Sequence, residues 1–129
     1  MSGSMVYDSG ALIAIGDTRN RTAADSHRGR LVQDVKIMVP AVVAAQVVRK
    51  PATQAPLMLA LRGCEIVPFT AAHHVQVGQL LAKSGTADVV DAFVALLAAR
   101  VGAAIVTGDP ADLRHLLSCL GAKLPILPV

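Results

Sequence analysis

The chain is poor in aromatic residues. Phe, Trp and Tyr make up 2% of its 129 residues, and tryptophan is absent. The aromatic side chains are Tyr7, Phe69 and Phe93. Proteins that bind single-stranded nucleic acid by stacking its bases need more rings than this, so the composition argues against that class of protein.

Cysteine and long apolar runs are also scarce. Cys64 and Cys119 lie far apart, in no spacing typical of a zinc or redox site, and we interpret both as reduced thiols of a cytoplasmic protein. No stretch supplies the roughly 20 apolar residues that a bilayer requires, since Arg100 interrupts the most apolar region. No basic segment precedes a long apolar run, so we expect neither a signal peptide nor a membrane span.

Charged residues are few as well, at 16%, against 53% hydrophobic residues. This composition is typical of one globular domain. The first four residues, MSGS, are interpreted as an expression scar, and residues 5–129 as a single domain. The formal net charge of +3 permits an anionic partner such as nucleic acid without requiring one.

Short apolar segments alternate with helical segments along the chain. The expected strands are Met5–Tyr7, Lys36–Val39, Cys64–Pro68, Ala104–Thr107 and Pro125–Leu127. The expected helices are Ser9–Gly16, Arg21–Val32, Pro40–Lys50, Gln54–Arg62, a helix capped by Thr70 and ending at Ser84, one capped by Thr86 and ending at Val101, and Pro110–Leu120. Strands that are apolar on both faces predict a buried parallel sheet. We therefore expect an α/β fold, a three-layer α/β/α sandwich around a short-stranded, mainly parallel central sheet.

Two aspartates follow strands of this sheet. Asp8 follows the first strand, and Asp109 follows the strand Ala104–Thr107. Each has an ordinary interpretation as the N-cap of the next helix, which Pro110 and Asp112 strengthen for Asp109. Because the carboxyl ends of parallel strands meet at one edge of the sheet, both aspartates are also expected near one site.

A further pair of aspartates, Asp88 and Asp91, begins an otherwise apolar helix. The helix dipole alone accounts for Asp88, which lies in the first turn. Asp91 is deeper, and a carboxylate on an apolar helix face is costly unless it is paired or bound to a metal. Carboxylates from three separate elements favour a hard divalent cation, Mg²⁺ or Mn²⁺, over zinc.

The order of these motifs resembles the PIN-domain family, most of all the VapC-type toxin ribonucleases of bacterial type II toxin–antitoxin systems. The matching stretches are VYDSGALIA, VPAVVAAQVVRK, DVVDAFVALLAARVGAAIVTGDPADL and PILPV. The 18-residue step from Asp91 to Asp109 matches the family's step between its third and fourth acidic residues. The resemblance implies a metal-dependent endoribonuclease in which Asp8, Asp91 and Asp109 hold Mg²⁺ or Mn²⁺, with Asp88 and Asp112 as further acidic residues. The metal would lower the pKa of a bound water and neutralise charge on the scissile phosphate.

The sequence departs from the family pattern at three positions. Gln46 stands where the family usually has a catalytic glutamate, and Gly10 and Gly108 stand where it often has small hydroxyl residues. Gln46 is interpreted either as a side chain hydrogen-bonded in the core or as a neutral group that lines the metal site. Ser9 and Thr107 remain as hydroxyl groups that could orient the carboxylates. The missing glutamate leaves open a weakened module that binds metal or RNA without turnover.

Basic residues supply a candidate RNA contact. The stretch TRNRTAADSHRGR carries Arg19, Arg21, Arg28 and Arg30, which form either a solvated helix face or a clamp for RNA phosphates. Arg49 lies three residues after Gln46 and is expected to pair with a site carboxylate or an RNA phosphate.

The resemblance also implies partners. These are a small antitoxin that blocks the site, a second copy of the chain in a homodimer, and a tRNA or another structured RNA as substrate. The apolar side chains of 54–62 and 70–84 suit a protein interface, although helices packed in their own core would look the same. A phospho-acceptor signalling domain has a similar α/β order, but it needs an aspartate after the third strand, where this chain reads VPFT.

Overall fold

The computed structural model describes residues 3–129, which form five strands and seven α-helices with one short 3₁₀ turn. The strands are β1 (Ser4–Tyr7), β2 (Lys36–Pro40), β3 (Glu65–Val67), β4 (Ala104–Thr107) and β5 (Ile126–Pro128). They form one sheet in the order β3-β2-β1-β4-β5, and every neighbouring pair is parallel. The expected α/β sandwich with a parallel central sheet is therefore confirmed.

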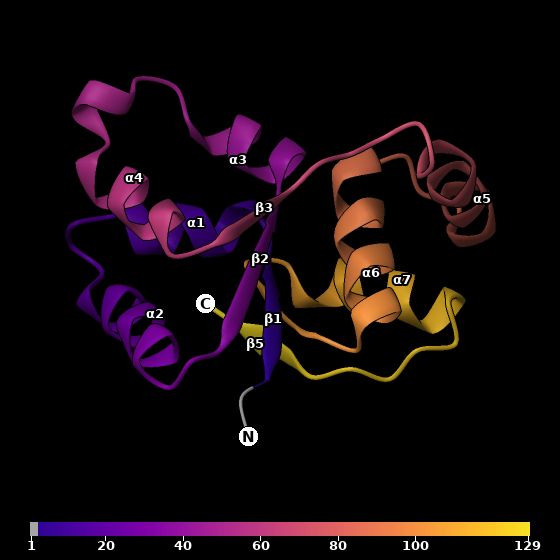
Figure 1. The fold of residues 1–129 in the computed structure, drawn as a ribbon. Coiled ribbons are helices and arrows are strands. Elements are labelled where there is room, and N and C mark those ends of the chain that lie inside the picture. The colour runs from indigo at the N-terminus through magenta and orange to yellow at the C-terminus, as the bar shows by residue number, and fades with distance from the viewer. Residues whose placement is uncertain (1–2) are drawn as a thin grey trace.

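The helices cover both faces of this sheet. They are α1 (Ser9–Gly16), α2 (Arg21–Val32), α3 (Ala41–Val47), α4 (Ala55–Arg62), α5 (His74–Ser84), α6 (Val89–Val101) and α7 (Pro110–Cys119), and the 3₁₀ turn is η1 (Pro51–Thr53). Helix α1 contacts α2, α3 and α4, whereas α5, α6 and α7 contact one another. Figure 1 shows these two groups on opposite sides of the sheet.

The register of β1 against β4 places the candidate site. Tyr7 pairs with Val106, so Asp8 and Thr107, the next residue of each segment, lie side by side. The amide of Asp8 donates to the carbonyl of Val106 at 3.1 Å, which continues the ladder past the end of β1. The two central strands thus deliver a carboxylate and a hydroxyl group to the carboxyl edge of the sheet.

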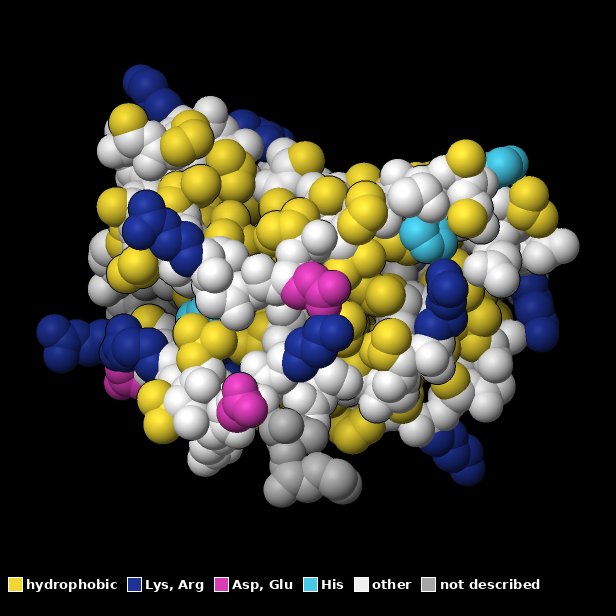
Figure 2. Space-filling model, viewed as in Figure 1, with side chains coloured by type: hydrophobic (Ala, Val, Ile, Leu, Met, Phe, Trp, Pro, Cys, Tyr) yellow, Lys and Arg dark blue, Asp and Glu magenta, His cyan; other side chains and the backbone are white. Residues whose placement is uncertain are grey.

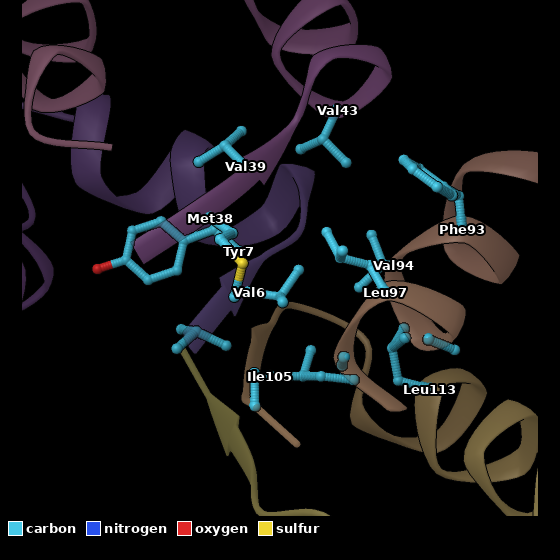
Figure 3. Packing of buried hydrophobic residues seen from close by; sticks show 14 of the residues in the cluster. Val6, Tyr7, Met38, Val39, Val43, Phe93, Val94, Leu97, Ile105 and Leu113 are labelled. Carbon is cyan, nitrogen blue, oxygen red and sulfur yellow. The ribbon is translucent and has the colours of Figure 1, made fainter. Parts of the chain in front are cut away.

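The core lies between the sheet and the two helical groups. Helix α6 is its main helical component: every residue from Ala92 to Ala98 is buried, because this helix packs on both the sheet and its helical neighbours. Figure 3 shows Val94 and Leu97 of this helix directed toward the strand residues. Phe93 also packs edge to face on Phe69, with ring centroids 5.0 Å apart.

A buried polar group lies on the opposite face of β1. The hydroxyl of Tyr7 is 2.8 Å from Nδ1 of His27 and accepts a hydrogen bond from Arg30 at 3.0 Å. Nε2 of His27 lies 3.3 Å from the carbonyl of Ala60 in α4, and burial lowers the pKa of this imidazole. These contacts are consistent with a neutral His27 that accepts from Tyr7 and donates to Ala60. They tie α2 and α4 to the strand that precedes Asp8.

Three helix boundaries differ from the sequence expectation. Helix α5 begins at His74 rather than after Thr70, because Nδ1 of His73 accepts the amide hydrogen of Thr70 in a preceding turn. Helix α6 is capped by Asp88 and not by Thr86, whose hydroxyl bonds to Ser84 instead. Helix α3 ends at Val47, three residues earlier than expected.

The remaining boundaries agree within one residue at most positions, and β1 includes Ser4, which pairs with Lys36. No helix within residues 3–129 is long and apolar enough to cross a membrane.

Candidate active site

Asp8 is a buried carboxylate with two fixed oxygens. Its side chain is 4% exposed. One oxygen, Oδ1, accepts the amide hydrogen of Ala11 at 3.0 Å and so caps α1, as the ordinary interpretation predicted. The other, Oδ2, accepts a hydrogen bond from the hydroxyl of Thr107. Both contacts hold the carboxylate in one orientation at the end of β1.

Thr107 connects this carboxylate to the segment that carries Asp109. The threonine is fully buried, and its hydroxyl oxygen accepts the amide hydrogen of Asp109 at 2.8 Å while its proton goes to Asp8. One hydroxyl group therefore links the ends of β1 and β4. The arrangement has the form of an outer-sphere group that orients a ligand, the function expected of Thr107 from the sequence.

Asp91 lies half-buried in the first turn of α6, where the carboxylate of Asp88 caps the helix by accepting the amide hydrogen of Asp91 at 3.0 Å. Burial raises the pKa of Asp91 to about 6, and the negative charges of neighbouring aspartates add to this increase. These neighbours are Asp88, Asp8, Asp112 and Asp109. Carboxylates from three elements therefore act on one another at this edge of the sheet, and no Lys or Arg of residues 3–129 forms an ion pair with them.

Asp109 begins α7, but its side chain makes no capping hydrogen bond. The ordinary interpretation of Asp109 as a cap therefore does not account for its carboxylate. A side-chain hydrogen bond with Asp109 raises the pKa of Asp112, and the charges of Asp109 and Asp88 contribute in the same direction. Both carboxylates are exposed, which leaves them accessible from solvent.

The sequence matches the PIN domain over residues 5–116. The chain belongs to the PIN domain family. Two solved structures have a fold similar to that of this chain. One is VapBC2 from Rickettsia felis, bound to a DNA fragment from its promoter. Its TM-score is 0.73 and its sequence identity is 17%, with 98% of each chain covered. The other is PAE2754 from Pyrobaculum aerophilum, with a TM-score of 0.62 at 19% identity over 95% of this chain and 91% of that one. No curated protein matches the chain.

The donor set of this PIN domain suits a hard divalent cation, because the gathered side chains offer only carboxylate oxygens. Within residues 3–129, no three His, Cys, Asp or Glu side chains are already placed to hold one ion together. Mg²⁺ commonly takes one or two protein carboxylates and retains several waters, so such a cage is not required. These aspartates fit a hard divalent cation because they offer oxygen ligands and carry negative charge that no Lys or Arg of residues 3–129 neutralises by an ion pair.

The interpretation of Gln46 as a core residue is wrong, and its position beside a metal site stays a prediction. Its side chain is exposed, so it is not hydrogen-bonded in the core, and it makes no hydrogen bond to the aspartates. It lines a surface cavity of about 470 Å³ between α1, α3 and α4, together with Leu12, Asp17 and Arg19. A carboxylate at this position would be solvated, which lowers the cost of a substitution to glutamate.

Two other predicted residues do not contact the site carboxylates. The guanidinium of Arg49 donates to the carbonyls of Ala45 and Val48, at 2.7 and 3.0 Å, and so closes the end of α3. The hydroxyl of Ser9 makes no hydrogen bond to any residue of 3–129.

Most arginines of α2 and of the loop before it already contact another side chain. Arg19 contacts Asp17, Arg28 contacts Asp25, and Arg30 lies over the ring of Tyr7 at 5.6 Å while donating to its hydroxyl. Arg21 alone among the four makes neither an ion pair nor a side-chain hydrogen bond with another residue of 3–129. On the face seen in Figure 2, Lys and Arg side chains stand apart over several elements and form no single patch.

Replacing Asp91 with asparagine should stabilise the metal-free protein at neutral pH. The pKa of the folded carboxyl is about 6, above the ordinary 3.8, so the stability that its protonated form contributes is lost as pH rises through 6. The neutral amide avoids this loss. Since the side chain is half-exposed, we expect a gain on the order of 1 kcal/mol at pH 7.5, vanishing near pH 4.

Urea denaturation in EDTA at both pH values measures this difference. Added Mg²⁺ should reverse the order, because it stabilises the parent more than the variant. Equal stability of the two proteins at both pH values would contradict the proposed repulsion.

Proposed function

We propose that this PIN domain is a metal-dependent endoribonuclease of the VapC type, the toxin of a toxin–antitoxin pair. In this proposal Asp8, Asp91 and Asp109 bind Mg²⁺ or Mn²⁺, and Asp88 and Asp112 add negative charge around them. The observation that carries it is the gathering of aspartates from three elements at the carboxyl edge of the sheet, where Ala11 and Thr107 hold the buried carboxylate of Asp8. The raised pKa of Asp91 agrees with this arrangement. Perturbed carboxylates of this kind cluster at functional sites.

Each side chain has a distinct contribution. Asp8 supplies an oriented carboxylate, because Ala11 and Thr107 fix both of its oxygens. Asp91 brings a carboxylate whose charge is poorly solvated, so cation binding relieves repulsion there. Asp109 contributes an exposed carboxylate that does not cap its helix. A bound Mg²⁺ would supply an acidic water and offset the charge of the scissile phosphate.

RNA binding is proposed for the arginines near α2. Exposed ion pairs such as Arg19 with Asp17 and Arg28 with Asp25 contribute little to stability, so both guanidinium groups can exchange partners for phosphates. Arg21 is available without such an exchange. Arg30 is committed to Tyr7 and is the weakest candidate.

The proposed partners follow from the same assignment. They are a cognate antitoxin, a second copy of the chain, and a tRNA or another structured RNA, in the cytoplasm. Exposed apolar side chains on α4 and α5, such as Leu59 and Val75 with 67% and 56% exposure, are available for a protein interface. In the R. felis structure, VapBC2 is bound to promoter DNA.

Cleavage of a labelled pool of structured RNAs, with Mg²⁺, Mn²⁺ or EDTA, tests the enzymatic proposal. Gln46→Glu should raise metal-dependent cleavage about tenfold, because it restores a carboxylate at the family's acidic position. Gln79→Glu, on the exposed surface of α5, adds the same charge elsewhere and is the matched control.

The outcomes separate enzyme from binding module. Cleavage by the parent that EDTA abolishes supports the nuclease. A silent parent with an active Gln46→Glu variant supports the second candidate, a weakened metal- or RNA-binding module, which the exposed and unpaired amide of Gln46 favours. If neither protein cleaves RNA or binds Mn²⁺ although both are folded, the proposed metal site is contradicted.

A further inference from the structure

Two glycines bring the first turn of α1 and the loop after β4 into direct backbone contact. A Cβ atom at Gly10 would lie 2.7 Å from both Cα and N of Gly108, and 3.4 Å from Oδ1 of Asp8. A Cβ atom at Gly108 would lie 3.2 Å from Cα of Gly10. The atoms in the way belong to the backbone, so no side-chain rotation can make room. Position 10 therefore excludes every side chain unless the segments separate, and position 108 is tight.

Backbone conformation does not explain these glycines. The glycines of this chain with positive φ are Gly85, Gly102 and Gly121, and each ends a helix. Gly10 and Gly108 are not among them, so any residue could adopt their backbone angles. The close approach of two segments is the remaining structural reason for glycine at both positions.

The contact lies between the two segments that carry site carboxylates. Gly10 follows Asp8 by two residues, and Gly108 stands between Thr107 and Asp109. The hydroxyl of Thr107 already joins the same two segments through Asp8 and the amide of Asp109. The side chain of Asp109 makes no capping bond, so these two contacts are the ones that join its segment to the start of α1.

We propose that Gly10 and Gly108 are positioning residues: their backbone contact holds the Asp109 segment against the start of α1, so that Asp8 and Asp109 serve one cation. This inference rests on the proposed function and adds to it two residues without functional groups. It also gives one physical reason why glycine stands at both positions, where the family often has small hydroxyl residues. A side chain at either position needs a wider separation of the two segments.

Gly10→Ala in the full chain tests the proposal with two readouts. Amide hydrogen exchange, followed by NMR, reports the hydrogen bond from Asp109 to Thr107 without any metal. We expect exchange at Asp109 at least about tenfold faster, and Mn²⁺ affinity, measured by water-proton relaxation, about tenfold weaker. Gly108→Ala should change the exchange at Asp109 and the Mn²⁺ affinity in the same directions, but by less. The melting temperature of Gly10→Ala should fall by about 5–10 °C.

Two controls separate positioning from general stability. Gly29→Ala makes the same change in α2, where a Cβ atom meets nothing within 4 Å, and should change neither readout. Val77→Ala removes buried methyl groups in α5 and should lower the melting temperature by a similar amount. It should leave the exchange of Asp109 and the Mn²⁺ affinity at their parental values.

The inference is overturned if Gly10→Ala keeps parental exchange at Asp109 and parental Mn²⁺ affinity, or if Val77→Ala changes both as strongly. A third outcome separates the two proposals. If the parent binds no Mn²⁺ while Gly10→Ala alone accelerates exchange at Asp109, the positioning of Asp109 stands and the proposed metal function fails.

Discussion

Asp8→Asn should reduce metal-dependent RNA cleavage at least about 100-fold and leave the protein folded. Loss of a group that merely orients a metal ligand costs 10- to 100-fold, so replacing a ligand that is itself held in place should cost at least the upper figure. The amide oxygen can still accept the hydrogen of Ala11 and cap α1. The amide nitrogen would face the hydroxyl of Thr107, whose proton then loses its acceptor, at about 1–3 kcal/mol of unfolding free energy.

Single-turnover cleavage of the labelled RNA pool, with circular dichroism of each protein, measures both effects. Asp34→Asn is the matched control, because this exposed aspartate between α2 and β2 forms no ion pair with another residue of 3–129. We expect parental cleavage from that variant. A folded Asp8→Asn protein that cleaves at the parental rate would remove Asp8 from the metal site and would leave the nuclease proposal without its central ligand.

The sheet and its carboxyl edge were predictable because their signals are local. Short apolar segments such as Ala104–Thr107 have one stable placement, inside a sheet buried on both faces, and this strand is found at the predicted residues. Parallel order then brings the ends of β1 and β4 to the same edge. The proximity of Asp8, Asp91 and Asp109 follows from topology, which alternating elements already imply.

The boundaries that failed depend on competition between neighbouring groups. Thr86 and Asp88 are both good N-caps, and only packing decides that Asp88 accepts the amide of Asp91. Thr70 precedes an apolar run, but the imidazole of His73 binds its amide and delays α5. The capping preferences of single residues cannot decide between two such candidates. The residue that becomes the cap depends on where the helix packs against the sheet.

Side-chain direction was equally hard to derive for α3. Arg49 was expected at a carboxylate or a phosphate, yet it bonds the carbonyls that the early end of α3 leaves free. Gln46, among valines and alanines, was expected either in the core or at the metal site, and its exposed side chain contradicts the core alternative. The contacts of Arg49 follow from where α3 stops, which is three residues before the predicted end.

The contact between Gly10 and Gly108 gave no usable sequence signal. Either glycine, taken alone, is typical of a loop or a helix start, and the two are 98 positions apart in the sequence. Only the assembled sheet shows that a Cβ atom at one would collide with the backbone of the other. The same is true of Thr107, whose two hydrogen bonds need both β1 and β4 in register.

Thr107→Val should weaken Mn²⁺ binding by about 10- to 100-fold and lower the unfolding free energy by about 3 kcal/mol. Valine has nearly the same shape, so the fully buried site stays filled. It cannot donate to Oδ2 of Asp8 or accept the amide hydrogen of Asp109. One buried carboxylate oxygen and one amide then lose their partner, and such orphaned groups cost about 1–3 kcal/mol each. Loss of an orienting hydrogen bond carries the stated penalty in affinity.

Thr107→Ser separates the hydroxyl from the methyl group. Serine retains both hydrogen bonds and loses one buried methyl, which costs about 1 kcal/mol. Urea denaturation should therefore show a modest loss for serine and a larger one for valine, while Mn²⁺ titration should show a loss for valine alone. If both variants lose affinity in proportion to their stability, Thr107 acts only through packing. If valine binds Mn²⁺ as the parent does, the orientation of Asp8 is set without the hydroxyl group, and the capping bond from Ala11 is the contact that fixes it.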